Sequence, residues 1–509
     1  MMKERLVPLT FAVVLAAVAL AACGPQPEPV DSEEPETASP AATEAPAAAS
    51  PIPTPAPPED PVTLNDYRTG EIPTLDPQLA DDFGSVNFVE NLFVNLTSRD
   101  PETLELVPEA ATGWQVSEDG LVYTFELRTD IPWVRHDPET GETEQVLDEA
   151  GDPRFVRAHD FAYAIRRACD PNLGSYYSSV VAPLVKGCED VLYAEDPAAI
   201  PPELVEAIGV SAPEDDTLVI ELEFPASYFE SMTPMWTLAA TPQWAIEEHD
   251  EAWIEPGKMV SNGRYVLHEW QRGVRSSLWR NPHLPQDMHG RGNIERVVAD
   301  VVPDKATAYA LWLKNELDVS GIPDLELEAH LDQFHGEAEQ IPDLTVYYTG
   351  FALDKPPFDN VHVRRAFSTA FDRETFAQDV MQGQCLPMIH FAPPGIFGAP
   401  PIDEVGVGYD PEYAAAQMVE AGYPNCEGFP QVTLLGYSGQ ATLNWIEFAQ
   451  NAWSETLGCD PELIQIEQQP FAELLAATAA SVPDSDTPHM WTLGWGPDYA
   501  DENNWVGDV

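Results

Sequence analysis

The sequence predicts an α/β protein built from two or three lobes, and three observations lead to this prediction. Short segments rich in β-branched and aromatic residues recur along the chain, and Pro, Gly, Asp or Asn bounds each of them. Helical patterns alternate with these segments. About 450 residues follow residue 61, and 44% of the chain is hydrophobic with 13 Trp, which is enough for large buried cores.

The strand-like segments and two helical segments can be placed by residue number. Residues 158–168 put Phe161, Ile165 and Ala168 on one helix face, and residues 361–381 read as two consecutive helices with Asp372 as the N-cap of the second. Alternating strands and helices lead us to expect mostly parallel sheets, with a ligand crevice outside strand ends. The expected strands are residues 61–67, 121–128, 217–224, 263–270, 294–302, 344–353, 431–437 and 463–468.

The N-terminus has the order of a secretory signal. Lys3 and Arg5 precede an apolar run over residues 6–22, and small residues lead to Cys23. Residues 20–24, LAACG, resemble the lipobox of bacterial lipoproteins, in which the signal is cut before a cysteine that then carries lipid. The alternative is an ordinary cleaved signal with an incidental cysteine. We expect a signal peptide over 1–22 and a lipid-anchored Cys23, outside the cytoplasmic membrane.

Residues 23–61 have the composition of a spacer. After Cys23 they are mostly Pro, Ala, Ser, Thr and Glu, with almost no large apolar side chain. Such a segment cannot bury enough apolar surface to offset its ordering entropy, so we expect a disordered linker that its prolines stiffen.

The charge balance excludes some partners. The chain has 24 Lys and Arg against 86 Asp and Glu, a formal net charge of −62. Nucleic acid and anionic lipid surfaces are bound through basic patches, so neither is an expected partner, and membrane contact would be through the anchor alone. The acidic surface would attract cationic ligands, and it can equally reflect a saline habitat.

Six cysteines allow specific pairings. With Cys23 used by the anchor, five remain, which in an oxidising exterior allow two disulfides and one thiol. Cys169 and Cys188 form the nearest local pair. Cys426 and Cys459 each precede a strand-like segment with a helix between, so a βαβ crossover would bring them close. A metal site is the competing use, but no C-x-x-C or histidine cluster accompanies them, so we expect neither metal nor cofactor.

The order of seven segments resembles that of the family 5 bacterial extracellular solute-binding proteins, the oligopeptide and dipeptide receptors of ABC importers. The most specific segment is 356–383, which is similar to the family's "PF-x-d-x-x-V-R-x-A-i-x-x-A-i-D-R" motif. Arg264 stands where the family usually has proline. The other matching segments are 73–100, 113–133, 159–171, 262–284, 414–424 and 494–505.

This resemblance implies a type II periplasmic-binding-protein-like α/β fold of two lobes, with an extra subdomain inserted in lobe I. Lobe I would be residues 62–305 with the insertion at about 96–209, and lobe II would be 306–495. Residues 496–509 would start the return to lobe I. Because family members usually continue for several tens of residues, we expect a C-terminal truncation.

The resemblance also suggests ligand-binding residues. Asp498 matches the family aspartate that pairs with a peptide's α-ammonium, although it could instead cap a turn. Trp495 would line the cleft or belong to the core. Tyr177 matches a ligand-contacting tyrosine of the inserted subdomain, with the adjacent tyrosine leaving the register open. Asp81 and Phe83 lie on the loop that lines the lobe I side. No basic residue close to Asp498 in sequence is available for a peptide C-terminus.

Other functions have weaker support in the sequence. Paired carboxylates arise by chance among 86 acidic residues, and no G-x-S-x-G, H-E-x-x-H, Walker or G-x-G-x-x-G motif is present, so we do not expect an enzyme. The function implied is a monomeric receptor that passes peptides to ABC permease subunits. The alternative is a receptor of the same class for an oligosaccharide, a metal chelate or a polyamine-like cation. A surface-adhesion lipoprotein is a third possibility.

Overall fold

The computed structural model describes residues 61–290, 292–323, 326–334, 336–339, 344–402, 404–478 and 487–507. The expected signal peptide, Cys23 and the linker up to residue 60 lie outside these ranges. The described residues all fall within one compact unit, Pro58–Val509. In the described part of the chain, no helix has both the length and the hydropathy required to cross a membrane.

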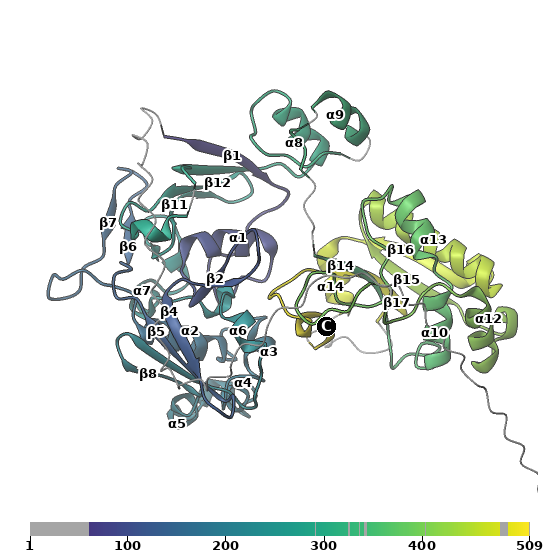
Figure 1. Ribbon diagram of the computed structural model, residues 1–509, viewed down its shortest axis with the longest axis horizontal. Helices are drawn as coiled ribbons and strands as arrows, with labels where there is room; N and C mark the ends of the chain where they lie inside the picture. The colour runs from purple at the N-terminus through teal and green to yellow at the C-terminus, as the bar shows by residue number, and fades with distance from the viewer. Residues whose placement is uncertain are drawn as a thin grey trace, which may run out of the picture. The chain divides into compact units, whose positions relative to one another are not determined.

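The first sheet has four strands in the order β1-β13-β12-β11. Figure 1 labels β1, β12 and β11 of this sheet. β1 pairs with β13 in parallel, and the other pairs are antiparallel. Helix α1 contacts β11. The bounds are β1 Thr63–Arg68, α1 Phe83–Leu92, β11 Tyr265–Gln271, β12 Arg275–Arg280 and β13 Arg296–Val301.

A second sheet, in the order β4-β5-β9-β8, is antiparallel throughout, and helix α2 packs on β8 and β9. Two smaller sheets, β2-β3 and β10-β6-β7, accompany it. The strands are β2 Thr97–Arg99, β3 Leu106–Pro108, β4 Ala111–Val116, β5 Val122–Leu127, β6 Val134–His136, β7 Thr143–Gln145, β8 Val210–Glu214, β9 Thr217–Glu221 and β10 Val260–Ser261. The helices are α2 Ala158–Ala168, α3 Ser178–Val181, α4 Cys188–Leu192, α5 Pro202–Glu206, α6 Phe229–Met232 and α7 Gln243–His249.

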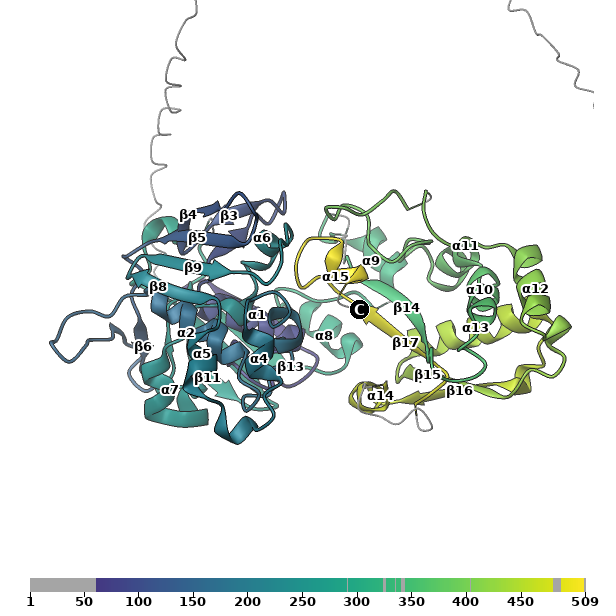
Figure 2. The ribbon, with the colours of Figure 1, turned by 90° about the horizontal axis from the view of Figure 1, so that it is seen from below.

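The third sheet has the order β14-β17-β15-β16, with α13 packed on β15 and β16 (Figure 2). β15 is parallel to both β16 and β17, and β14 is antiparallel to β17. The strands are β14 Val346–Phe351, β15 Val432–Tyr437, β16 Ile464–Gln469 and β17 Met490–Trp495. The helices are α8 Lys305–Trp312, α9 Leu327–Gln333, α10 Val361–Thr369, α11 Arg373–Thr375, α12 Pro411–Glu420, α13 Gln440–Leu457, α14 Phe471–Thr478 and α15 Asn503–Val506.

The expected strands and helices are present, but the expectation of mostly parallel sheets is wrong. Each predicted strand segment overlaps one of β1, β5, β9, β11, β13, β14, β15 and β16, to within one residue at the C-terminal end of β1, β11 and β16. Asp372 caps α11, and a π-helical turn over Phe376–Val380 continues it. Antiparallel pairs predominate because short turns join β4 to β5, β8 to β9 and β11 to β12, and a turn of that length returns the chain antiparallel.

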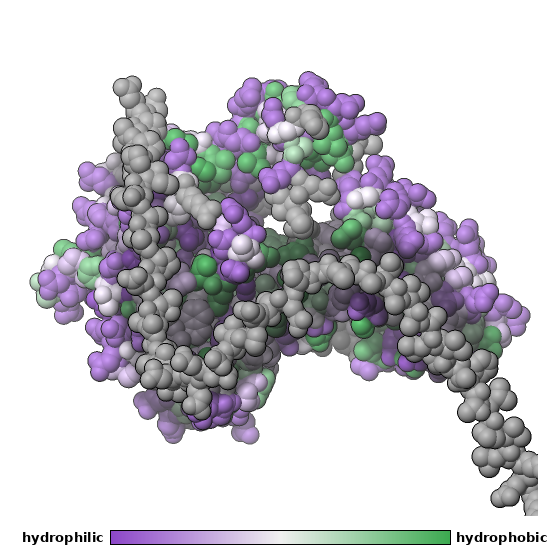
Figure 3. Space-filling view, in the orientation of Figure 1, coloured by the Kyte–Doolittle hydropathy of each residue, from purple (hydrophilic) through white to green (hydrophobic). Residues whose placement is uncertain are grey.

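Buried apolar residues form separate cores. The largest cluster includes residues of the first two sheets and their helices, and also Tyr499 from the C-terminal segment. A second cluster packs α10, α12 and α13 on the third sheet. Val346, Ala392, Ile396 and Trp505 form a small third cluster. In Figure 3, hydrophilic residues predominate at the outer edges of the face shown, in keeping with the charge of −62.

Buried polar contacts give a structural reason for the Asn-Gly pair that begins the matching segment 262–284. The Asn262 side-chain oxygen accepts a hydrogen bond from the Val94 amide at 2.8 Å, and the Gly263 amide donates to the Leu92 carbonyl at 2.9 Å. A Cβ added to Gly263 would lie 2.4 Å from the Asn91 carbonyl oxygen. The Asn-Gly pair therefore holds the segment just before β11 against the C-terminus of α1, at a distance that only glycine allows.

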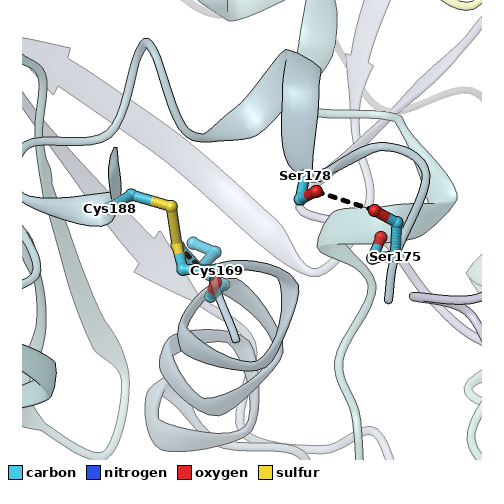
Figure 4. The surroundings of a disulfide bond; sticks show 5 residues. Cys169, Ser175, Ser178 and Cys188 are labelled. Atoms are coloured by element: carbon cyan, nitrogen blue, oxygen red, sulfur yellow. Dashed lines mark hydrogen bonds between the residues drawn. A yellow bond between two sulfur atoms is a disulfide. The ribbon is translucent and has the colours of Figure 1, made fainter. Parts of the chain in front are cut away.

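Both expected disulfides are present. Cys169 at the end of α2 bonds Cys188 at the start of α4, beside the turn in which the Ser178 hydroxyl donates to the Ser175 carbonyl (Figure 4). Cys426 bonds Cys459 next to the parallel pair β15 and β16. Cys385 is a free thiol.

Candidate functional site

The segment after β17 places Asp498 in a network of hydrogen bonds. Its Oδ1 accepts from the Tyr177 hydroxyl at 2.7 Å, and its Oδ2 accepts from Asn504 Nδ2 at 3.1 Å. The Asp498 amide donates to Asn504 Oδ1 at 3.0 Å. The carboxylate is therefore fixed both within its own turn and by a tyrosine more than 300 positions earlier.

Tyr177 lies just before α3 and is 6% exposed, whereas Tyr176 is 57% exposed. The Tyr177 ring stands edge-on to Trp236, with ring centroids 4.9 Å apart, and Trp236 Nε1 donates to the Ala80 carbonyl. Burial and the negative charge of Asp498 raise the pKa of Tyr177, so the hydroxyl remains a donor. Tyr177 is thus the tyrosine whose hydroxyl donates a hydrogen bond to Asp498, while Tyr176 interacts with Asp498 as a neighbouring charge.

The loop before α1 lies beside the same segment. Asp82 caps α1 by accepting from the Ser85 amide at 3.0 Å, which exposes its neighbours Asp81 and Phe83. The Phe83 ring packs on Gly496, since a Cβ there would lie 2.7 Å from Phe83 Cζ. Burial and then the charge of Asp82 raise the pKa of Asp81.

Trp495 contacts both a buried cluster and the turn that carries Asp498. Its Nε1 donates to Asn504 Oδ1 at 3.3 Å, and its half-buried ring packs against the small cluster around Trp505. These contacts give Trp495 a supporting role for the turn that carries Asp498. Asn504, which is fully buried, was not anticipated, because only the folded turn shows that it bonds both residues.

A pocket of about 320 Å³ opens beside Asp498. Two arginines, Arg99 and Arg264, line it, although neither is close to Asp498 in sequence. Arg99 ends β2 and Arg264 lies just before β11, so the fold brings to the pocket two basic residues that are distant from Asp498 in sequence. The lining residues are Glu90, Asn95, Thr97, Ser98, Arg99, Leu104, Glu109, Pro234, Arg264, Leu344, Ile396, Pro497, Asp498, Tyr499 and Ala500.

Both arginines already have partners. Arg264 Nη2 lies 3.2 Å from Glu109 Oε1, and its Nε donates to the Met288 carbonyl. Arg99 donates to the carbonyls of Leu104 and Ser231. Neither guanidinium is therefore set up to receive a ligand carboxylate.

Two pocket carboxylates, Glu90 and Glu109, have strongly raised pKa values. Burial raises the pKa of Glu109 to about 7 even though Arg264 opposes the shift. The Glu90 side chain is exposed to the pocket, but protein surrounds it, and this loss of bulk water raises its pKa to about 7. Perturbed carboxylates in a pocket are typical of functional sites. Among the described residues, no group of three His, Cys, Asp or Glu is arranged to hold a metal ion.

Comparisons with known proteins give a consistent result. The sequence profile of the bacterial extracellular solute-binding proteins, family 5 middle region, matches residues 105–507. The probable deoxycholate-binding periplasmic protein YgiS of Escherichia coli is 30% identical over 356 residues, which are 69% of this chain and 61% of YgiS. The periplasmic oligopeptide-binding protein OppA of Escherichia coli is 26% identical over 467 residues, 88% of this chain and 78% of OppA.

Solved structures share the fold. The murein tripeptide binding protein MppA of Escherichia coli superimposes with a TM-score of 0.70 at 21% identity, covering 88% of this chain and 82% of MppA. Haemophilus influenzae OppA in complex with RPPGFSPFR gives a TM-score of 0.68 at 23% identity, with 88% and 82% covered. The chain thus has the two-lobed periplasmic-binding-protein-like fold with an extra domain, and it belongs to the family 5 bacterial extracellular solute-binding proteins.

Proposed function

We propose that this chain is the receptor of an ABC importer and that its solute is a peptide whose α-ammonium pairs with Asp498. The observation that carries the proposal is the Asp498 carboxylate, which Tyr177 and Asn504 orient at the side of the 320 Å³ pocket. A carboxylate with its position fixed before the ligand arrives loses little entropy on binding. An ammonium desolvated against it would orient the peptide and disfavour ligands without the amine.

Relatives support a peptide and also provide an alternative. OppA of Haemophilus influenzae is described in complex with RPPGFSPFR, and OppA of Listeria monocytogenes bound to peptide. YgiS is described as a probable deoxycholate-binding protein, and another relative as heme-binding protein A. The second candidate is therefore a receptor for a non-peptide solute, such as an oligosaccharide, a metal chelate or a polyamine-like cation.

We also propose how the chain is placed and used. A lipid on Cys23 and the spacer up to residue 61 would hold the receptor at the outer face of the cytoplasmic membrane. Lobe I (62–305, with its insertion at 96–209) and lobe II (306–495) would close on the solute as a monomer and present it to permease subunits. Residues 496–509 would begin a return to lobe I. The energy would come from the partner ATPase.

The test is a thermal-shift and calorimetric screen with tri- and tetrapeptides and their N-acetylated forms. Wild type should be stabilised by free peptides and not by acetylated ones, because a ligand that binds only the folded state raises Tm by mass action. Asp498→Asn should lose about 2–5 kcal/mol of binding free energy for free peptides. Asp359→Asn is the control, since Asp359 is an exposed carboxylate in the turn before α10.

The outcomes separate the two candidates. Equal binding of free and acetylated peptides would contradict the role of Asp498 and leave a peptide receptor. If no peptide raises the Tm but an oligosaccharide, a chelate or a bile acid does, the receptor binds that solute and the peptide proposal is wrong. The Tm of each ligand-free variant shows whether the substitution has damaged the fold.

A further inference from the structure

The pocket beside Asp498 holds two carboxyl groups that the binding of an α-ammonium by Asp498 does not use. Its charged residues outside the turn of Asp498 are Glu90, Glu109, Arg99 and Arg264. Arg99 is directed at backbone carbonyls and interacts electrostatically with Asp501, outside the pocket lining. Arg264 is the arginine whose charge acts on both Glu90 and Glu109.

Glu109 is the inner carboxylate and is fixed in place. Its side chain is 9% exposed, its Oε2 accepts from the Asn95 amide at 3.0 Å, and its Oε1 accepts from Arg264. The ion pair leaves Arg264 38% exposed, so the guanidinium closes one side of the pocket without filling it. A carboxyl group held in this way has a fixed position, and a ligand cation beside it would favour its charged form.

Glu90 is the outer carboxylate and has no such partner. It lies on the last turn of α1, and within the described ranges its side chain forms no hydrogen bond or ion pair. It interacts with Arg264 only as a neighbouring charge. Loss of surrounding water without a compensating partner keeps its pKa at about 7. A ligand cation would supply the ion-pair partner that the described residues do not provide for Glu90.

A second polar group in the same pocket also lacks a partner. Asn95 is 6% exposed, and its side-chain oxygen finds no hydrogen-bond donor among the described residues. An unsatisfied buried acceptor costs about 1–3 kcal/mol, so such groups usually meet a ligand or water. An acceptor next to two carboxylates matches a ligand group that donates several hydrogen bonds and carries positive charge, as ammonium and guanidinium do.

We propose that Glu90, Glu109 and Asn95 form a subsite for a cationic side chain of the bound peptide, adjacent to the Asp498 site. The volume of about 320 Å³ lies within the range of small-ligand pockets, about 300–1,000 Å³. Asp498 would balance the α-ammonium, and Glu90 with Glu109 would balance Arg264 and a lysine or arginine side chain. The receptor would thus select basic peptides. This inference rests on the proposed peptide function.

The test compares peptides that differ only in one charge. Lysine is moved through each position of tri-alanine, and each peptide is paired with its norleucine analogue, which lacks the ammonium. Calorimetry with wild type should show a preference of about tenfold or more for lysine at one position near the amino end. Glu90→Gln should abolish this preference, so that the lysine and norleucine peptides bind with equal affinity. Glu105→Gln, an exposed carboxylate before β3, is the matched control.

A charge reversal and a free cation complete the design. Glu90→Lys should shift the preference at the same position from lysine to glutamate. Agmatine, which carries a guanidinium and an ammonium, should raise the Tm of wild type and not of Glu90→Gln. A lysine preference that survives Glu90→Gln overturns the subsite but leaves peptide binding intact. An agmatine shift that depends on Glu90, with no peptide binding, keeps the subsite and overturns the peptide function. No response to either ligand overturns both.

Discussion

The buried ion pair between Asp76 and Arg167 joins two segments that are distant in sequence. Breaking it tests how much this pair stabilises the largest buried cluster. Arg167 Nη1 lies 2.6 Å from Asp76 Oδ1, and Nη2 lies 2.7 Å from Oδ2. Gln78 Oε1 accepts from the same Nη1, and Trp253 Nε1 donates to Asp76 Oδ2 at 3.1 Å. The two charged side chains are 11% and 4% exposed. Replacing Arg167 by methionine leaves the Asp76 carboxylate buried with only neutral donors.

The magnitude follows from the burial of this pair. Removing one partner of a buried ion pair costs about 3–5 kcal/mol, because the other charge stays desolvated. Arg167→Met should therefore lower the free energy of unfolding of this region by about 4 kcal/mol. Arg167→Lys should recover only part of this loss, since an ammonium cannot reproduce the two-point contact of a guanidinium.

The assay is urea unfolding followed by hydrogen exchange of the α2 amides, because a two-lobed chain need not unfold in one step. Arg275→Met is the control, since Arg275 pairs with Asp300 at the surface, with 46% and 40% of the side chains exposed. This variant should lose less than about 1 kcal/mol. If Arg167→Met costs no more than the control, the reasoning from desolvation is wrong.

Three further predictions concern stability. Gly263→Ala should lose about 1–3 kcal/mol in urea unfolding because its Cβ would collide with the backbone of α1, whereas Gly113→Ala, which has open space, should lose far less. Replacing Cys426 and Cys459 by alanine should cost about 3–4 kcal/mol, as expected for a cross-link spanning 33 positions, and an unchanged urea midpoint would contradict this. Burial lowers the pKa of His136 to about 4 from about 6.5 in the unfolded chain, so the unfolded state binds more protons between these values. The free energy of unfolding of wild type, relative to that of His136→Asn, should therefore fall as pH decreases from 6.5 to 4. A difference that does not change with pH would show that folding does not lower the pKa of His136.

Local sequence patterns predicted part of the regular structure. The segments rich in β-branched and aromatic residues became strands and residues 158–168 became α2, because local composition, side-chain periodicity and caps act within a few residues. Asp372 caps its helix for the same reason. Both disulfides were predictable as well, one from its short separation and one from the geometry of a βαβ unit. Several strands and the antiparallel pairing of the sheets were missed, since pairing depends on contacts between distant segments. The strands not predicted are β2, β3, β4, β6, β7, β8, β10, β12 and β17.

The binding site was only partly predictable. Asp498 and Tyr177 were reached through resemblance to a family, and the hydrogen bond between them appears only in the folded chain. Glu90, Glu109 and their neighbour Arg264 gave no usable signal, except that Arg264 departs from the usual proline. In a chain with 86 acidic residues, two more glutamates are indistinguishable until burial separates them from the rest.

By itself, the sequence determined the class of fold, the local elements and the excess of negative charge, because these follow from composition and from interactions between near neighbours. Only the tertiary structure decided which carboxylates lose their water and which cations face them. Burial and electrostatic pairing depend on distances between residues that are hundreds of positions apart, as Tyr177 and Asp498 are. The pKa values and charge pairing of the pocket residues therefore depend on the fold, although the sequence supplies every one of these residues.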